Sequence, residues 1–129
     1  MRFDLGPSLA ALKVAAAADI DAQAERLRLT LITAGAGQAL VYERKRAEAE
    51  RMVGDAEPQP ADYPLLAAEV GITAPTLAEV GAAVRAMASD WIAAAATIEA
   101  VRLRAKAQIA AASTPPAIRA AAQVAWPAF

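Results

Sequence analysis

The sequence predicts an all-α protein: an elongated helical bundle with an N-terminal helical hairpin and one long, heptad-patterned helix. Alanine, the residue with the highest helix propensity, fills about thirty per cent of the 129 residues. No stretch shows the apolar–polar alternation of a strand. Late in the chain, apolar residues recur in a 3-4-3-4 alternation, the spacing of a seam that faces a partner helix. The seam consists of Leu77, Val80, Val84, Met87, Trp91, Ala94, Ile98, Val101 and Ala105.

The long helix is the element that the sequence predicts most clearly. Neither Gly nor Pro interrupts the chain from Ala82 to Thr114, and Thr76 with Glu79 forms a capping-box pattern at the head. A helix over about Leu77 to Ala112 would be roughly 54 Å long at ~1.5 Å per residue. A compact globule of this chain length has a radius of gyration of only about 14 Å. We therefore expect an elongated protein.

The N-terminal part, residues 1–54, is expected to form the helical hairpin. After the entry at Ser8, apolar residues at three- and four-residue steps predict a helix to about Ile32. The glycines in Thr33–Gly37 predict a helix end and a tight reversal. A second, highly charged helix is expected over Gln38–Val53.

The remaining chain divides at its prolines. Residues 55–62 read as a short polar linker, after which Asp62 is expected to cap a brief helix with Pro64 in its first turn. Residues 63–112 hold this brief helix and the long one, and 113–129 hold a short helix from Pro115 to about Val124 and a tail. We expect residues 1–129 to form a single helical domain.

The sequence is compatible with two partners for the seam. The long helix can pack on the first helix of its own chain, or on copies of itself about a symmetry axis. The first helix would span only roughly 36 Å at ~1.5 Å per residue, too short to cover the whole long helix. A homo-oligomer, for example a trimer, is therefore one expectation.

Composition argues against several classes of function. The chain has no Cys and no His, the usual ligands of zinc, copper and haem, so no metal and no cofactor is expected. A net charge of −1 gives no cationic surplus for nucleic acid. The longest uncharged stretches, Leu29–Tyr42 and Ala107–Ile118, are too short to cross a membrane. Asp4 and Lys13 interrupt the N-terminal apolar run, so no secretory signal peptide is expected.

One stretch has the apolar spacing of a helix-turn-helix, from Leu66 to Val80 with Gly71 at the turn. The residues that would face DNA are Thr73, Ala74, Pro75, Thr76, Ala78 and Glu79. None of them is an Arg, Lys, Asn or Gln that could read bases or grip phosphate. The spacing thus predicts a corner between two helices and no DNA binding.

Catalytic groups are not evident either. The carboxylate pairs Asp19/Asp21 and Glu48/Glu50 are two positions apart, so each pair diverges on a helix. Asp90 lies beside Trp91 but has no nucleophile and base with it. We expect no enzyme and no small-molecule substrate.

Two further features are candidates for contact with other proteins. Arg102, Arg104 and Lys106 form a basic run that suits the end of a helix and could also meet an acidic surface. Trp126 and Phe129 place large rings near the chain end, either tucked onto the body or anchoring a partner.

Several stretches together resemble a loosely defined helical family encoded in bacteriophages and prophages, often beside or within tail-fibre genes. The resemblance covers roughly Ala24 to Pro127. It is carried by Gly35-Ala36-Gly37-Gln38-Ala39 with Tyr42, Lys45 and Glu48-Ala49-Glu50; Asp62-Tyr63-Pro64-Leu65-Leu66-Ala67-Ala68-Glu69; Thr76-Leu77-Ala78-Glu79-Val80; Trp91; Ile98-Glu99-Ala100 with Arg102, Ala105-Lys106 and Ile109; and Ala125-Trp126-Pro127.

The resemblance implies a phage tail-associated protein and brings no catalytic residues with it. The expected function is that of a structural component of the tail, in the fibre or baseplate region, with other tail proteins and copies of itself as partners. The alternative is a non-virion chaperone or adaptor that assembles tail fibres. The expected location is the virion tail, or the host cytoplasm during assembly.

Overall fold

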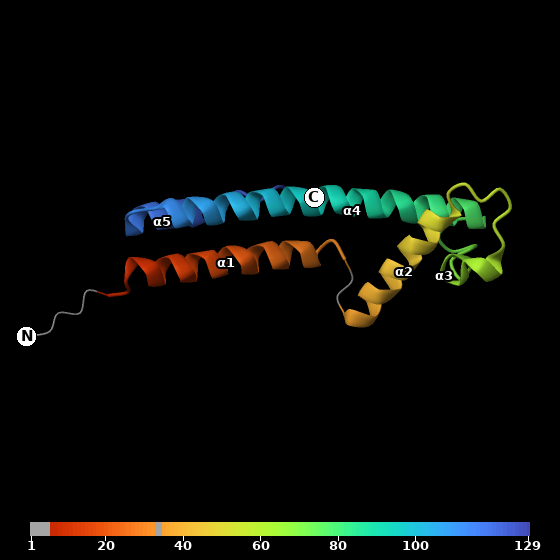
Figure 1. The fold of residues 1–129 in the computed structure, drawn as a ribbon, viewed down its shortest axis with the longest axis horizontal. Coiled ribbons are helices and arrows are strands. Elements are labelled where there is room, and N and C mark those ends of the chain that lie inside the picture. Colours follow the sequence, from red (N-terminus) through yellow and green to blue (C-terminus); the bar gives the residue numbers. More distant parts are fainter. Residues whose placement is uncertain (1–5, 33–34) are drawn as a thin grey trace, which may run out of the picture. The chain divides into compact units, whose positions relative to one another are not determined.

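The computed structural model describes residues 6–32 and 35–129, and this part of the chain is helical (Figure 1). It contains no β-strand, only an isolated bridge between Val70 and Ala74. The elements are α1 (Leu9–Leu29), α2 (Ala36–Met52), the 3-10 turn η1 (Pro60–Asp62), α3 (Pro64–Ala67), α4 (Leu77–Ala111) and α5 (Pro115–Ala122). The predicted all-α class and its long helix are confirmed.

The contacts divide the chain into two compact units. Unit 1 combines residues 1–31 with 94–129, and unit 2 comprises residues 32–93. Helix α4 contributes its C-terminal half to unit 1 and its N-terminal half to unit 2. The two helices of the expected hairpin, α1 and α2, belong to different units.

Three helix starts follow from side-chain caps. The Ser8 Oγ accepts a hydrogen bond from the amide of Ala11, and the Thr76 Oγ1 accepts one from Glu79 at the head of α4. The Thr114 Oγ1 accepts one from the amide of Ala117 at the start of α5, where Pro115 also fits the first turn. Each cap satisfies an amide that has no partner within its helix.

The start of the second helix and the cap of the brief helix were predicted wrongly. Gly37 lies inside α2, and Gly35 starts this helix with a φ of 119° that favours glycine. Asp62 does not cap α3, because it lies in η1 and Tyr63 occupies the capping position without a side-chain bond. Thr33 and Ala34, expected in the reversal, lie outside the described residues.

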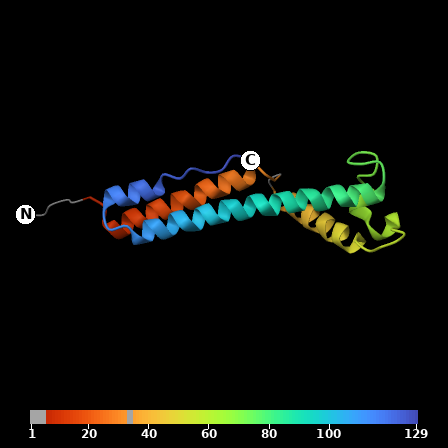
Figure 2. The ribbon, with the colours of Figure 1, turned by 90° about the horizontal axis from the view of Figure 1, so that it is seen from above.

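In unit 1, α1, the C-terminal half of α4 and α5 lie side by side (Figure 2). Their buried core consists of Ile20, Ala105, Ile109 and Ile118. The Lys13 Nζ also donates to the Ala110 carbonyl oxygen at 2.6 Å, near the end of α4. The alternative in which the long helix packs on the first helix of its own chain therefore holds for this half of α4.

In unit 2, the C-terminal end of α2 and the short α3 pack on the N-terminal half of α4. The buried core consists of Ala49, Met52, Tyr63, Leu66, Val80 and Val84. A Cβ atom added at Gly81 would lie 2.8 Å from the Met52 sulfur. Gly81 is unfavourable for helix formation, but it makes room for the Met52 side chain.

Candidate functional site

The buried stripe of α4 follows the predicted seam in part. Val80 and Val84 are buried in unit 2, and Ile98 is buried in unit 1. Leu77 packs at the edge of the unit 2 core, and Val101 is half-buried. The predicted seam thus has its apolar contacts within the chain at these positions.

Met87 departs from this stripe, since its side chain is 58% exposed. The buried position on this turn belongs to Ala88, one residue further along the helix. A one-residue shift turns a helical side chain by about 100°, which is enough to place Met87 outside the contact. Trp91 is half-buried, and its indole nitrogen is buried with no hydrogen-bond partner among the described residues.

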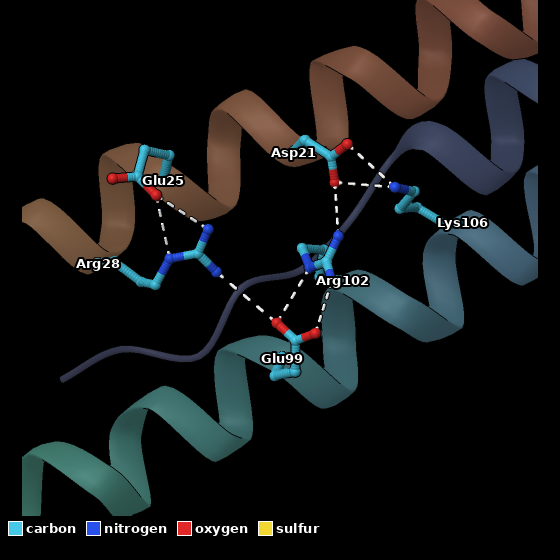
Figure 3. A network of polar contacts seen from close by, with 6 residues as sticks. All are labelled: Asp21, Glu25, Arg28, Glu99, Arg102 and Lys106. Carbon is cyan, nitrogen blue, oxygen red and sulfur yellow. Dashed lines mark hydrogen bonds and ion pairs between the residues drawn. The ribbon is translucent and has the colours of Figure 1, made fainter.

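A polar network joins α1 to α4 in unit 1 (Figure 3). Asp21 accepts hydrogen bonds from Arg102 at 2.8 Å and from Lys106 at 3.0 Å. Arg102 also pairs with Glu99 one turn earlier on α4, and Arg28 of α1 lies 3.8 Å from the same carboxylate. Two residues of the predicted basic run are therefore paired with acidic residues of their own chain, whereas Arg104 is exposed.

The network shifts the protonation of its carboxylates. Hydrogen bonds from Arg102 and Lys106 lower the pKa of Asp21 below its ordinary value. The hydrogen bond from Arg102 likewise lowers the pKa of Glu99. Arg102 is held in its charged form because its pKa is raised by Glu99 and Asp21. These shifts are those expected of an ion-paired contact between two helices.

Glu48 has a role that its neighbours in the sequence do not indicate. Its side chain is buried and turned toward α3. Its carboxylate accepts hydrogen bonds from the amides of Leu65 and Leu66, each at 3.0 Å through Oε2. Glu48 therefore supplies the cap that was expected from Asp62. It lies 17 residues before Leu65, whose amide it accepts from.

Tyr63 extends this junction in unit 2. Its hydroxyl donates to the Asp55 carboxylate at 2.6 Å, and the Arg51 guanidinium lies 5.3 Å from the ring centre. The hydrogen bond to Asp55, together with burial, raises the pKa of Tyr63. Arg51 also donates to the Asp62 carbonyl oxygen, which fixes the linker to α2. The linker 55–62 is thus tied to the unit 2 core by several bonds.

An open groove lies between α2 and α4 within unit 2, with a volume of about 240 Å³. Arg85 donates to the Ala49 carbonyl oxygen at 2.8 Å, and no carboxylate among residues 6–32 and 35–129 lies within ion-pair distance of it. Ile92, which also lines the groove, is 55% exposed. The groove is lined by Arg46, Glu50, Arg85, Ala88, Ser89 and Ile92.

The two aromatic residues near the chain end differ in environment. Trp126 packs against the unit 1 core, and its Nε1 donates to the Gln23 side-chain oxygen at 2.9 Å. It therefore adopts the tucked alternative. The Phe129 ring is 57% exposed, so its role as a partner contact stays a prediction.

The remaining candidates form no site that the geometry supports. Gly71, with a φ of 83°, turns the chain between α3 and α4, but α3 has only four residues. Within the described residues, no cluster of acidic side chains could hold a metal ion. No helix in this part of the chain is both long and apolar enough to cross a membrane.

Comparison with known proteins gives no relative. No family model matches the chain, and neither a curated protein nor a solved structure shows significant similarity to it.

Proposed function

We propose that the protein is a structural component of a bacteriophage tail, in the fibre or baseplate region, and that it acts through helix–helix contacts. The phage assignment rests on the resemblance of the sequence between Ala24 and Pro127. The observation that carries the helix–helix part is the outer surface of α4. Met87 on one side of the helix, and Ile92 and Leu103 on another, remain more than half exposed there.

The surface of α4 suits contact with another helix. A partner that covers a large exposed apolar side chain is stabilised by the burial, by about 25 cal/mol for each Å² of apolar surface removed from water. Helix α4 has 35 residues, so it has many turns on which a partner helix could pack. Its partners would be copies of the chain and other tail proteins, in the virion or in the host cytoplasm during assembly.

The elongated bundle with an N-terminal hairpin belongs to the same proposal. Small-angle scattering of the purified protein tests this shape, because a rod gives a maximum dimension far above that of a globule. A profile typical of a compact globule would contradict it.

The second candidate is a tail-fibre assembly chaperone that leaves before the particle is complete. The exposed Phe129 is compatible with this candidate and with a virion protein, because a single exposed ring can anchor either a transient or a lasting contact. Mass spectrometry of purified particles separates the two. A virion component is present in a fixed ratio to other tail proteins, whereas a chaperone is found only in the lysate.

A further inference from the structure

We propose that α4 contains a hinge at residues 89–97, a segment that we call the connector. The connector loses its helical hydrogen bonds locally while the cores of unit 1 and unit 2 both stay folded. This is a conformational property of the chain itself. It rests neither on the phage assignment nor on the proposed partners of α4.

The connector separates the two buried parts of α4. Ala88 is the last buried residue in the unit 2 half of the helix, and Ile98 is the first in the unit 1 half. All nine residues between them are described by the structure, and none is buried. The boundary between the two units falls among them, after Ala93. About two and a half turns of α4 therefore lie outside both cores.

The connector depends on helix propensity more than on packing. Most helices in proteins owe their stability to a packed apolar face, and an isolated segment shorter than about 12–15 residues is marginal in water even when it is rich in alanine. Opening the connector breaks backbone hydrogen bonds and exposes no core residue. Opening either neighbouring part of α4 also exposes buried side chains, such as Val84 in unit 2 or Ile109 in unit 1. The connector is thus the part of α4 that opens at the lowest cost.

Trp91 lowers this cost further. It is the largest side chain of the connector and is only half-buried. Its indole nitrogen is nevertheless buried, with no hydrogen-bond partner among the described residues. A buried donor without an acceptor has lost its hydration, and local opening returns water to it. Trp126, in contrast, donates to Gln23 within unit 1, so its indole nitrogen gains no such hydration from opening.

Amide hydrogen exchange of the full-length wild type tests the hinge directly. A long helix that opens only by fraying from its ends exchanges most slowly in its middle. We expect the reverse in α4: the amides of residues 92–96 should exchange at least about tenfold faster than those of Val84 and Ile109. Equal rates along the helix, or the slowest exchange in the connector, would overturn the proposal.

A matched pair of glycine variants separates the connector from unit 1. Ala96→Gly and Ala107→Gly each replace an exposed alanine of α4, one inside the connector and one beside the unit 1 core. Ala96→Gly should speed exchange of the connector amides about fivefold and leave that of the Ile109 amide unchanged. Ala107→Gly should do the opposite. If either variant changed both rates equally, α4 would open as one piece and the hinge would be excluded.

Proline at the same two positions tests whether the cores survive a broken connector. Proline removes an amide donor and clashes with the carbonyl four residues earlier, and for Ala96→Pro both places lie within the connector. The buried Leu66 and Ile109 report on unit 2 and unit 1 through their amide signals in a urea titration. Ala96→Pro should keep both signals and their midpoints, whereas Ala107→Pro should lose the Ile109 signal alone. The proposal fails if the two proline variants behave alike, or if Ala96→Pro loses either signal.

Discussion

Removing the Glu48 carboxylate tests the most specific contact in unit 2. The side chain satisfies two amides at the start of α3, of which the Leu66 amide is buried and the Leu65 amide is half-buried. A buried amide left without an acceptor costs about 1–3 kcal/mol, and a lost cap costs about 0.5–2 kcal/mol. We therefore expect Glu48→Ala to lower the free energy of unfolding by about 2–4 kcal/mol.

The assay is urea unfolding followed by circular dichroism, combined with amide hydrogen exchange. Glu48→Gln keeps an acceptor oxygen without the charge, so its cost should be smaller, about 1 kcal/mol. Glu50→Ala, two positions on and exposed, is the control and should change stability by less than about 0.5 kcal/mol. In Glu48→Ala, the Leu65 and Leu66 amides should exchange faster. If Glu48→Ala and Glu50→Ala had the same small effect, the capping role of Glu48 would be refuted.

Three other predictions concern the helix contacts. Asp21→Asn should destabilise unit 1 at neutral pH. Because ion pairing lowers the pKa of Asp21, its stabilisation is present above the ordinary aspartate pKa of about 3.9 and is lost as the pH falls through the lower folded value. Urea midpoints of the variant and the wild type should therefore converge as the pH falls below the ordinary aspartate value. Asp19→Asn, whose carboxylate accepts a hydrogen bond from Gln23 of its own helix, is the control at neutral pH. Ile98→Ala should lower the free energy of unfolding by about 2–5 kcal/mol because Ile98 is fully buried, whereas Met87→Ala should lower it by less than about 0.5 kcal/mol. Equal melting temperatures of the two variants would contradict the burial of Ile98 and the exposure of Met87. Gly81→Ala should stabilise the Met52→Ala variant by about 1 kcal/mol, because alanine has the higher helix propensity. In the wild type the gain should be smaller, or become a loss, because the added Cβ meets the Met52 sulfur. Identical effects in both backgrounds would show that Met52 does not occupy the space beside Gly81.

The helices and their caps could be predicted because they depend on local sequence. Ser8, Thr76 and Thr114 act within three residues of their own position, so a short pattern is enough to identify them. The uninterrupted run of good helix formers likewise predicted α4 to within one residue of its observed end at Ala111.

The errors concern contacts between distant parts of the chain. Glu48 has good helical partners at three and four residues, and no local signal shows that it caps α3 instead. The choice between Met87 and Ala88 also depends on how α2 and α3 approach α4, which the heptad spacing alone does not determine. Asp21 and Arg102 are 81 residues apart, and their pairing emerges only when α1 packs on α4.

The candidate site shows the same division. The apolar spacing predicted a contact face and left open whether its partner belongs to the same chain, and the structure buries Val80, Val84 and Ile98 of that face within the chain. The opposite face of α4 was not singled out, since small alanines are typical of any helix in this chain.

The most direct test of the central claim, that α4 binds a helix outside its own chain, is the solution mass of the wild-type protein by light scattering at two concentrations. The account predicts a mass that rises with concentration to an integer multiple of the single chain. The mass of a single chain at both concentrations would contradict self-association through α4.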